Sequence, residues 1–131
     1  MRKSGGRPGW QQVEIDGFEV LVGRSARDND ELTFRIARPR DLWLHASGNA
    51  GSHVVIRAPE SGEEVPREVV DRAAAYAAWH SKARHARGKV EVHVCRAADV
   101  RKPRGAPPGT VELRRYDVVR VYPREIASRA E

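Results

Sequence analysis

The stretch Asp41-Leu42-Trp43-Leu44-His45-Ala46, followed after a short Gly/Asn turn by Gly51-Ser52-His53-Val54-Val55-Ile56-Arg57, decides the fold of this chain. Its two apolar runs flank a tight connection, which predicts two neighbouring strands at about residues 42–46 and 52–57. Side chains able to touch a ligand sit at the edges of both runs: Asp41, Trp43, His45, Ser52 and His53. A hairpin needed only for stability has no use for two imidazoles, a carboxylate and an indole. The stretch therefore predicts a strand pair that also carries a binding site.

The residues before this strand pair predict a hairpin and a short helix. Residues 10–15 and 18–22 alternate in polarity around Asp16-Gly17, a dipeptide typical of two-residue hairpin turns. Further along, Asn29 or the residue before it can cap a short helix that runs to about Ala37.

The residues after the strand pair predict a long helix and three more strands. Pro66 is well placed to open a helix, and an apolar face made mostly of alanine follows it at helical spacing. Gly88 suits the C-cap, so the helix is expected to run to Ala86 or Arg87. Strands are expected at 90–96, 110–115 and 118–122. The last two are expected to pair with each other.

These elements predict an α+β fold in one domain. A mostly antiparallel sheet is expected to carry one long Ala-rich helix and one short helix packed on it. The domain is expected to span residues 10–124, with a flexible basic arm at 1–9 and a polar tail at 125–131. A chain of 131 residues is long enough to bury a core of its own.

Composition places the chain among soluble globular proteins. Hydrophobic residues make up 40% of it and charged residues 32%, and no apolar run approaches the roughly 20 residues of a transmembrane helix. The N-terminus lacks the apolar segment of a secretory signal. The single cysteine, Cys95, cannot form an intramolecular disulfide and is expected to be buried. These features predict a cytoplasmic protein that binds no membrane.

Positive charge is concentrated in the second half of the chain. The formal net charge is +6; residues 1–65 hold 9 Lys and Arg against 10 Asp and Glu, whereas residues 66–131 hold 15 against 8. Such an excess attracts polyanions, nucleic acid among them. It also fits a solvated surface in an arginine-rich proteome, so charge alone leaves both interpretations open.

Several further motifs occur in the same order in a known family. They are Val22-Gly23-Arg24-Ser25 with Asn29-Asp30, the Ala-rich helix running into Ser81-Lys82-Ala83-Arg84, the loop from Val100-Arg101-Lys102-Pro103-Arg104-Gly105 to Pro108-Gly109, and Val119-Arg120-Val121-Tyr122-Pro123. Over about residues 12–123 the chain resembles NFACT-R, the RNA-binding domain of the NFACT proteins, which act in ribosome-associated quality control. Ser25 departs from the Asn that this family has after Gly-Arg.

The resemblance implies a function and partners. A stand-alone NFACT-R protein is expected to be a non-catalytic RNA-binding module without cofactors. Its expected partners are tRNA or rRNA and the large ribosomal subunit. This sequence carries no counterpart of the N-terminal and coiled-coil regions of the full-length proteins. Their complete activity, recruiting tRNA to a stalled large subunit for C-terminal tailing, is therefore not expected of it, and its oligomeric state is left open.

The residues themselves support an RNA site. Four cations are expected on loops, where they can reach phosphates: Arg24, Arg101, Lys102 and Arg104. The rings of Trp43, His45 and His53 can stack on unpaired bases or bond to base edges. Three polar side chains are expected to complete the site: Asn29, Asp41 and Ser52. Trp43 also fits the core, and Asp41 also fits an anchor at the strand start.

Other functions remain as alternatives. An RNA-processing or RNA-modifying enzyme would be centred on Asp41, His45 and His53, with the histidines as an acid/base pair, but the sequence offers no separate nucleophile. Ser52 and His53 are adjacent on a strand, so alternation points them to opposite faces. No metal site is expected, since there is no second Cys and no His-x-x-x-His pair nearby. Surface adhesion, a label given to related full-length proteins, is disfavoured by the missing secretion signal.

Overall fold

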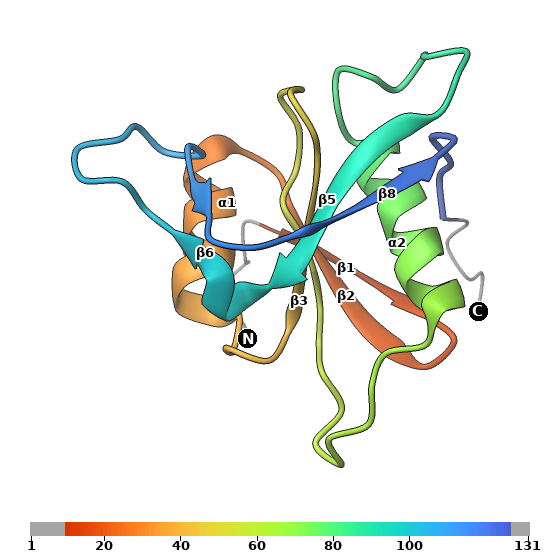
Figure 1. Cartoon of the computed structure of the whole chain (residues 1–131), viewed down its shortest axis with the longest axis horizontal. Coiled ribbons are helices and arrows are strands. Elements are labelled where there is room, and N and C mark those ends of the chain that lie inside the picture. Colours follow the sequence, from red (N-terminus) through yellow and green to blue (C-terminus); the bar gives the residue numbers. More distant parts are fainter. Residues whose placement is uncertain (1–9, 127–131) are drawn as a thin grey trace, which may run out of the picture.

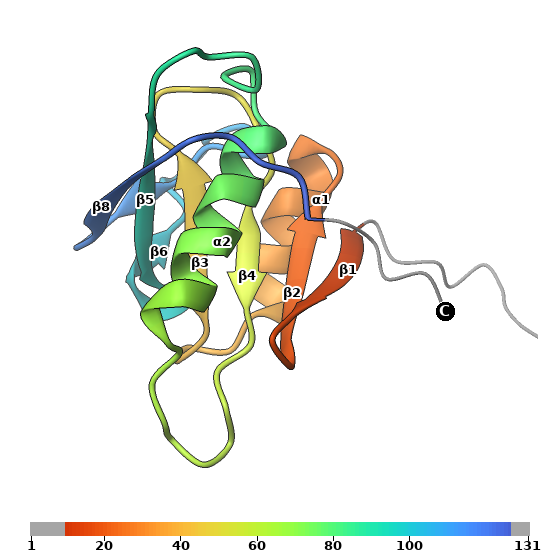
Figure 2. The same cartoon turned by 90° about the vertical axis from the view of Figure 1, so that its right-hand side faces the viewer.

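The chain folds around one antiparallel sheet with helices on both faces (Figures 1 and 2). The structure is a computed structural model that describes residues 10–126; the expected arm at 1–9 and most of the expected tail at 125–131 lie outside the described residues. Six strands pair in the order β1-β2-β4-β3-β5-β8. They are β1 (Trp10–Ile15), β2 (Phe18–Gly23), β4 (Val54–Ile56), β3 (Leu42–Ala46), β5 (Val90–Arg96) and β8 (Asp117–Val121).

Two short strands and four helical segments complete the fold. β6 (Val100–Arg101) and β7 (Glu112–Leu113) form a separate two-stranded sheet, and the loop between them projects on the α1 side (Figure 1). The helical segments are α1 (Ala26–Glu31), the π-helical turn η1 (Leu32–Ile36), α2 (Arg67–Trp79) and the 3-10 turn η2 (Ala97–Asp99).

The strand pair predicted from the sequence lies at the centre of the sheet. β3 and β4 are antiparallel, with Leu44 opposite Val54. β4 is shorter than expected because the residues before it bond to other segments. The N–H of Gly23 donates to the carbonyl of His53 at 3.0 Å, and the N–H of Ser52 donates to the carbonyl of His80 at 3.0 Å.

α2 covers one face of the sheet. Its residues Ala73, Ala74 and Ala77 are fully buried against side chains such as Leu44 and Val54. Alanine has a small side chain, so the helix backbone packs close to the sheet, and burying this apolar surface stabilises the fold at roughly 25 cal/mol per Å².

α1 and η1 cover the opposite face. There a row of directly paired residues crosses four strands: Leu21, Val55, Trp43 and Cys95. Leu32 of η1 packs on this row. Burial, aided by two nearby aspartates, raises the pKa of the Cys95 thiol to about 12.

The helix lengths correct the sequence-based expectation. α2 has 13 residues and ends at Trp79, so the long helix reaching Ala86 or Arg87 is wrong. On the other face, α1 has six residues and the η1 turn that follows it has five. The expected pair of one long and one short helix is therefore not found. The α+β class and the mostly antiparallel sheet hold.

The chain leaves α2 early because the following residues pair with the β3–β4 connection. The N–H of Lys82 donates to the carbonyl of Ala50 at 2.9 Å, and Ser81 forms a bridge with Gly51. A Cβ at Gly51 would lie 2.8 Å from the carbonyl oxygen of His80, so the approach requires glycine. These long-range contacts outweigh the helix-forming residues that continue past Trp79.

The last two expected strands do not pair with each other. β7 joins β6, whereas β8 joins β5, with Val119 opposite Val92. The chain crosses between the two sheets near Arg114, whose N–H donates to the carbonyl of Asp99 at 2.8 Å.

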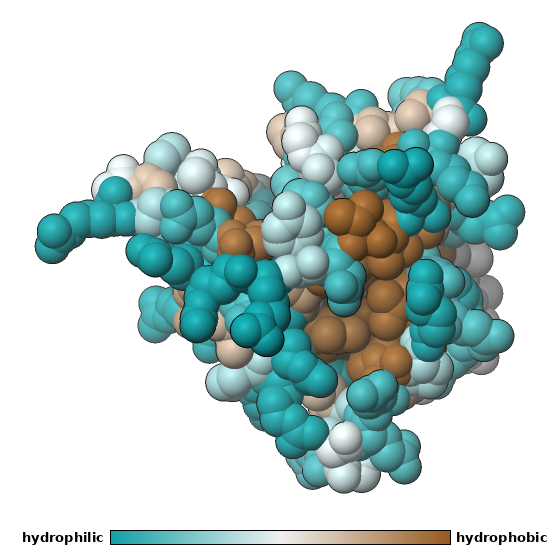
Figure 3. Space-filling view, viewed as in Figure 1, coloured by the Kyte–Doolittle hydropathy of each residue, from teal (hydrophilic) through white to brown (hydrophobic). Residues whose placement is uncertain are grey.

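The surface differs from one side of the molecule to the other. Apolar side chains gather between β8 and α2, while hydrophilic side chains dominate the side of β6 and its loop (Figure 3). Within residues 10–126 no helix has the length and apolar character needed to cross a bilayer.

Candidate nucleic-acid interface

A surface cleft of about 490 Å³ lies where four segments meet. Its walls come from the residues after β2, from the end of β3 and the β3–β4 connection, from the end of the β6–β7 loop, and from His80 after α2. The cleft brings together four of the residues predicted from the sequence: Arg24, Asn29, His45 and Ser52. Gly109 faces them from the loop.

Arg24 and Ser25 form the rim at the start of α1. The Ser25 hydroxyl accepts a hydrogen bond from the N–H of Asp28 at 3.1 Å, so Ser25 is the N-cap that was expected at Asp28 or Asn29. Ser25, where the family has Asn, therefore caps the N-terminus of α1. Arg24 beside it is exposed.

Asn29 braces the floor of the cleft. Its Nδ2 donates to the carbonyl of Gly51 at 3.2 Å, and its Oδ1 accepts from the N–H of His53 at 3.1 Å. A Cβ at Gly23 would lie 1.9 Å from this Oδ1, so only glycine fits beside the amide. The buried Asn29 thus orders the cleft, with both ends of its amide engaged.

Ser52 joins the opposite wall to β2. Its hydroxyl donates to the carbonyl of Gly23 at 2.6 Å. Because the Ser52 hydroxyl donates its hydrogen to a backbone carbonyl, it does not donate it to a general base. Ser52 is therefore placed as a structural tie that lines the cleft.

Trp43, Thr33 and His53 form a buried chain of hydrogen bonds behind the cleft. The indole Nε1 of Trp43 donates to Thr33 Oγ1 at 3.0 Å, and that oxygen lies 2.9 Å from His53 Nδ1. Trp43 and His53 are each only 1% exposed. Trp43 thus belongs to the core, the structural alternative raised from its sequence position.

His53 is held uncharged. Burial, followed by the neighbouring His45, lowers the pKa of His53 to about 3. The Thr33 hydroxyl accepts from the indole and shares a second hydrogen bond with Nδ1 of this ring. A buried neutral imidazole of this kind makes no ion pair with phosphate.

Two partly exposed histidines line the cleft: His80, which follows α2, and His45. The ring centroid of His45 lies 5.3 Å from that of His53. Burial and then the nearby His93 lower the pKa of His45. Its ring is therefore suited to stacking and hydrogen bonding in the neutral form.

Asp41 lies at the far end of β3 from His45 and is 2% exposed. Its carboxylate accepts hydrogen bonds from the N–H of Arg38 at 2.9 Å, the N–H of Ala58 at 2.8 Å and Nη1 of Arg57 at 3.1 Å. Asp41 and His45 are four positions apart in the sequence, which in an extended strand corresponds to roughly 13 Å. The structure therefore does not bring Asp41 to the cleft.

Lys102 fastens the β6–β7 loop to α1. Its Nζ lies 2.8 Å from Asp30 Oδ2 and donates to the carbonyls of Pro107 at 2.6 Å and Thr110 at 3.0 Å. The other carboxylate oxygen of Asp30 accepts from the N–H of Gly109 at 2.9 Å. These partners occupy all three hydrogens of the ammonium group, so Lys102 shapes the loop.

The remaining predicted cations differ in availability. Arg101 lies 3.6 Å from Glu112 in an exposed ion pair. Arg24 and Arg104 are exposed, and neither forms an ion pair within residues 10–126. The described part of the chain also holds no group of three His, Cys, Asp or Glu side chains placed to bind a metal.

A comparison with known families decides what kind of domain this is. The model of the NFACT protein RNA binding domain matches residues 9–115. The chain belongs to this family. The motifs from Gly23-Arg24 to the loop at 101–109 lie inside the matched region, whereas the last motif, at 119–123, lies beyond it. Residues of the first and of the loop motif, Arg24 and Gly109, meet at the cleft.

Relatives of this NFACT RNA-binding domain are much longer proteins. Rqc2 homolog RqcH of Streptococcus suis is 42% identical over 106 residues, which cover 81% of this chain and 18% of the relative. RqcH of Bacillus subtilis is 41% identical over 107 residues, again 18% of its length. A ribosome quality control complex subunit NEMF homolog of Drosophila melanogaster is 32% identical over 75 residues, or 53% of this chain and 8% of the relative. The chain thus spans less than a fifth of these proteins.

A solved structure has the same fold as this NFACT RNA-binding domain. It is the C-terminal part of the fibronectin/fibrinogen-binding protein of Streptococcus suis, with a TM-score of 0.81 and 39% sequence identity. The match covers 94% of this chain and 48% of that one.

Sequence reasoning missed two residues that hold the NFACT cleft together. Thr33 links Trp43 to His53, and Asp30 holds both Lys102 and Gly109. Asp30 lies in the Asn29-Asp30 motif, which was a signal. Thr33 sits in a short helical stretch with no distinguishing pattern around it.

Proposed function

We propose that this chain is a non-catalytic RNA-binding module that contacts tRNA or rRNA in ribosome-associated quality control. The observation that carries the proposal is the cleft, where an exposed Arg24 and the reachable ring of His45 lie beside a loop held rigid by Lys102 and Asp30. Membership of the NFACT RNA-binding family and the names of its relatives support the same function.

The chemistry of the site suits phosphates and bases together. In this proposal the exposed Arg24 and Arg104 contact phosphate oxygens, and the surplus of basic residues in the second half of the chain draws RNA toward them. A loop that is already ordered loses little entropy when it docks. The large ribosomal subunit is a further proposed partner, which would place the protein in the cytoplasm.

A salt titration tests the proposal. Fluorescence anisotropy of labelled tRNA with the full chain should give a log affinity that falls linearly with log salt. Arg24→Ala should weaken binding and reduce the slope by about one, since one phosphate contact is lost. Arg67→Ala is the matched control, because Arg67 is an exposed arginine of α2 on the opposite face. Absence of tRNA binding at low salt, or an unchanged slope in Arg24→Ala, would refute the proposal.

Catalysis centred on Asp41, His45 and His53 gains no support from the geometry. Asp41 lies at the other end of β3 with its carboxylate bonded, and His53 is buried and neutral. An acid/base pair at neutral pH needs a group with a pKa near that pH. Labelled tRNA is accordingly expected to stay intact after incubation with the protein, with or without divalent metal.

A further inference from the structure

A second row of side chains crosses the sheet beside the buried Trp43 row. The pairing registers place His45 opposite His93, and His93 opposite Val118. Because side chains alternate along strands, this row lies on the same face as Trp43 and Cys95, two residues further along each strand. Its near end is the cleft, since His45 lines it.

The side chains of this row are more exposed than those of the Trp43 row. Trp43 is covered by η1, whereas Val118 is 47% exposed and His45 and His93 are partly exposed. Tyr116, just before β8, is 49% exposed and has its ring centroid 4.3 Å from that of His93, with the planes inclined by 38°. We call His45, His93, Tyr116 and Val118 the ring strip.

Core packing does not account for the exposed end of the ring strip. Tyr116 and Val118 lie at the free edge of the sheet formed by β8 and are about half exposed, so they add little to the core, and an exposed edge is more often protected by charge. The contact of Tyr116 with His93 instead orders two rings on an open surface. Strand spacing of roughly 4.8 Å makes the strip about two strand intervals long, which suits a few stacked bases.

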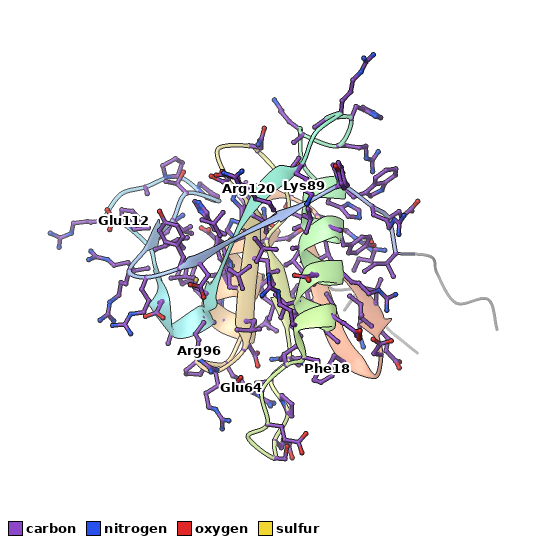
Figure 4. All side chains as sticks on the ribbon, turned by 45° about the vertical axis from the view of Figure 1, so that its right-hand side comes forward. Phe18, Glu64, Lys89, Arg96, Glu112 and Arg120 are labelled. Atoms are coloured by element: carbon purple, nitrogen blue, oxygen red, sulfur yellow. The ribbon has the colours of Figure 1, made fainter. Side chains whose placement is uncertain are left out.

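Positive charge borders the ring strip at Tyr116. Arg115, which precedes Tyr116, is exposed and forms no ion pair within residues 10–126. Arg120, two residues beyond Val118, is paired with Glu91 at 2.9 Å, and together with Lys89 (Figure 4) it lines the groove against α2. Exposed rings beside an arginine fit a polyanion that carries planar bases, whereas an apolar protein partner has no use for the charge.

We propose that the ring strip binds unpaired nucleotides, which leave the cleft at His45 and stack along His93 and Tyr116. The proposal rests on the RNA-binding function proposed above and names the form of RNA that the site selects. Bases in a duplex are stacked on each other and present no free face, so a paired region does not fit the strip. The depressed pKa of His45 keeps its ring neutral for stacking.

The test compares a short labelled oligoadenylate with a perfectly paired RNA duplex of the same length. The full chain should bind the oligoadenylate more tightly than the duplex. Tyr116→Ala should weaken oligoadenylate binding by about ten-fold, the usual effect of removing one stacking ring. Tyr116→Phe should retain binding because the ring remains. Tyr122→Ala is the matched control, since Tyr122 is an exposed tyrosine that lines a groove with Arg72 and Ala75 of α2.

Each outcome separates this inference from the proposed function. Equal binding of duplex and oligoadenylate, or unchanged oligoadenylate binding by Tyr116→Ala, would overturn the ring strip while tRNA binding through Arg24 stands. If the unaltered chain bound neither tRNA nor the oligoadenylate nor the duplex, both the ring strip and the proposed function would be overturned. Tyr116 is exposed, so its variants are expected to keep the thermal unfolding midpoint, and His93→Ala gives an independent second variant with the same expected loss.

Discussion

Gly23 packs directly against the side chain of Asn29 at the floor of the cleft. A methyl group there would meet Asn29 Oδ1 at 1.9 Å, so Gly23→Ala must push the amide away from Gly51 and His53. We expect a loss of about 1–3 kcal/mol in the free energy of unfolding, measured by urea denaturation. Gly88→Ala is the control, because a Cβ at Gly88 meets nothing within 4 Å. Equal stability of the two variants would contradict the fit described.

His53 makes stability depend on pH. In the unfolded chain its pKa is near 6.5, and in the folded chain burial lowers that pKa to about 3. Between these values the unfolded chain binds a proton that the folded chain does not. The free energy of unfolding should therefore be fully retained above pH 6.5 and fall below it, by up to about 1.4 kcal/mol per pH unit.

Urea denaturation at a series of pH values checks this expectation. His45, whose pKa is also lowered, adds to the fall in the same direction. His53→Gln removes the larger contribution and should flatten the curve below pH 6.5. An equally steep fall in that variant would assign the acid sensitivity to other groups.

Single residues also mark the limit of what the sequence predicts. Arg24 and His45 lie at a cleft, as expected of binding residues. Asp41 belongs to the same stretch as His45, yet its carboxylate accepts hydrogen bonds from Arg57 and from two backbone amides. Position in a strand fixes the face of a side chain but not which end of the strand meets the other segments, so Asp41 and His45 could not be separated from sequence.

Among the elements, the β6–β7 loop depends on one lysine. Lys102→Gln removes the ion pair with Asp30, so the loop should open more often. We expect faster trypsin cleavage after Arg104, followed by mass spectrometry, because proteases cut segments that unfold locally. Arg101→Gln keeps the Lys102 contacts and should leave the cleavage rate near that of the unaltered chain. Equal rates in both variants would contradict the role given to Lys102.

The elements that alternate in polarity were predictable, and those set by distant contacts were not. β3 and β4 follow from their alternating and apolar residues, and β5 follows from its own. The end of α2 depends on the bridge between Ser81 and Gly51, which lie 30 positions apart. The partner of β7 likewise depends on β6 and not on the neighbouring β8. Local patterns carry no information on such pairings.

At the scale of the whole molecule, the sheet separates two surfaces. α2 covers one face of the sheet, and α1 lies on the other (Figure 2). The residues that line the cleft include the start of α1 and the end of the β6–β7 loop, and the ring strip shares the face of Trp43. Hydrogen exchange should therefore slow in residues 24–29, 45–53 and 104–118 when tRNA is added, while the amides of α2 exchange as before. Slower exchange in α2 instead would contradict an RNA interface on the α1 side of the sheet.

The enclosed position of Cys95 has a practical consequence for measuring such complexes. It is the only cysteine of the chain, and with its pKa raised to about 12 the thiol stays protonated and unreactive near neutral pH. A cysteine introduced in place of the exposed Pro107, which leaves Arg104 intact, would carry a fluorophore or crosslinker without competition from the native thiol. The natural sequence thus already provides the background needed for site-directed labelling of the loop.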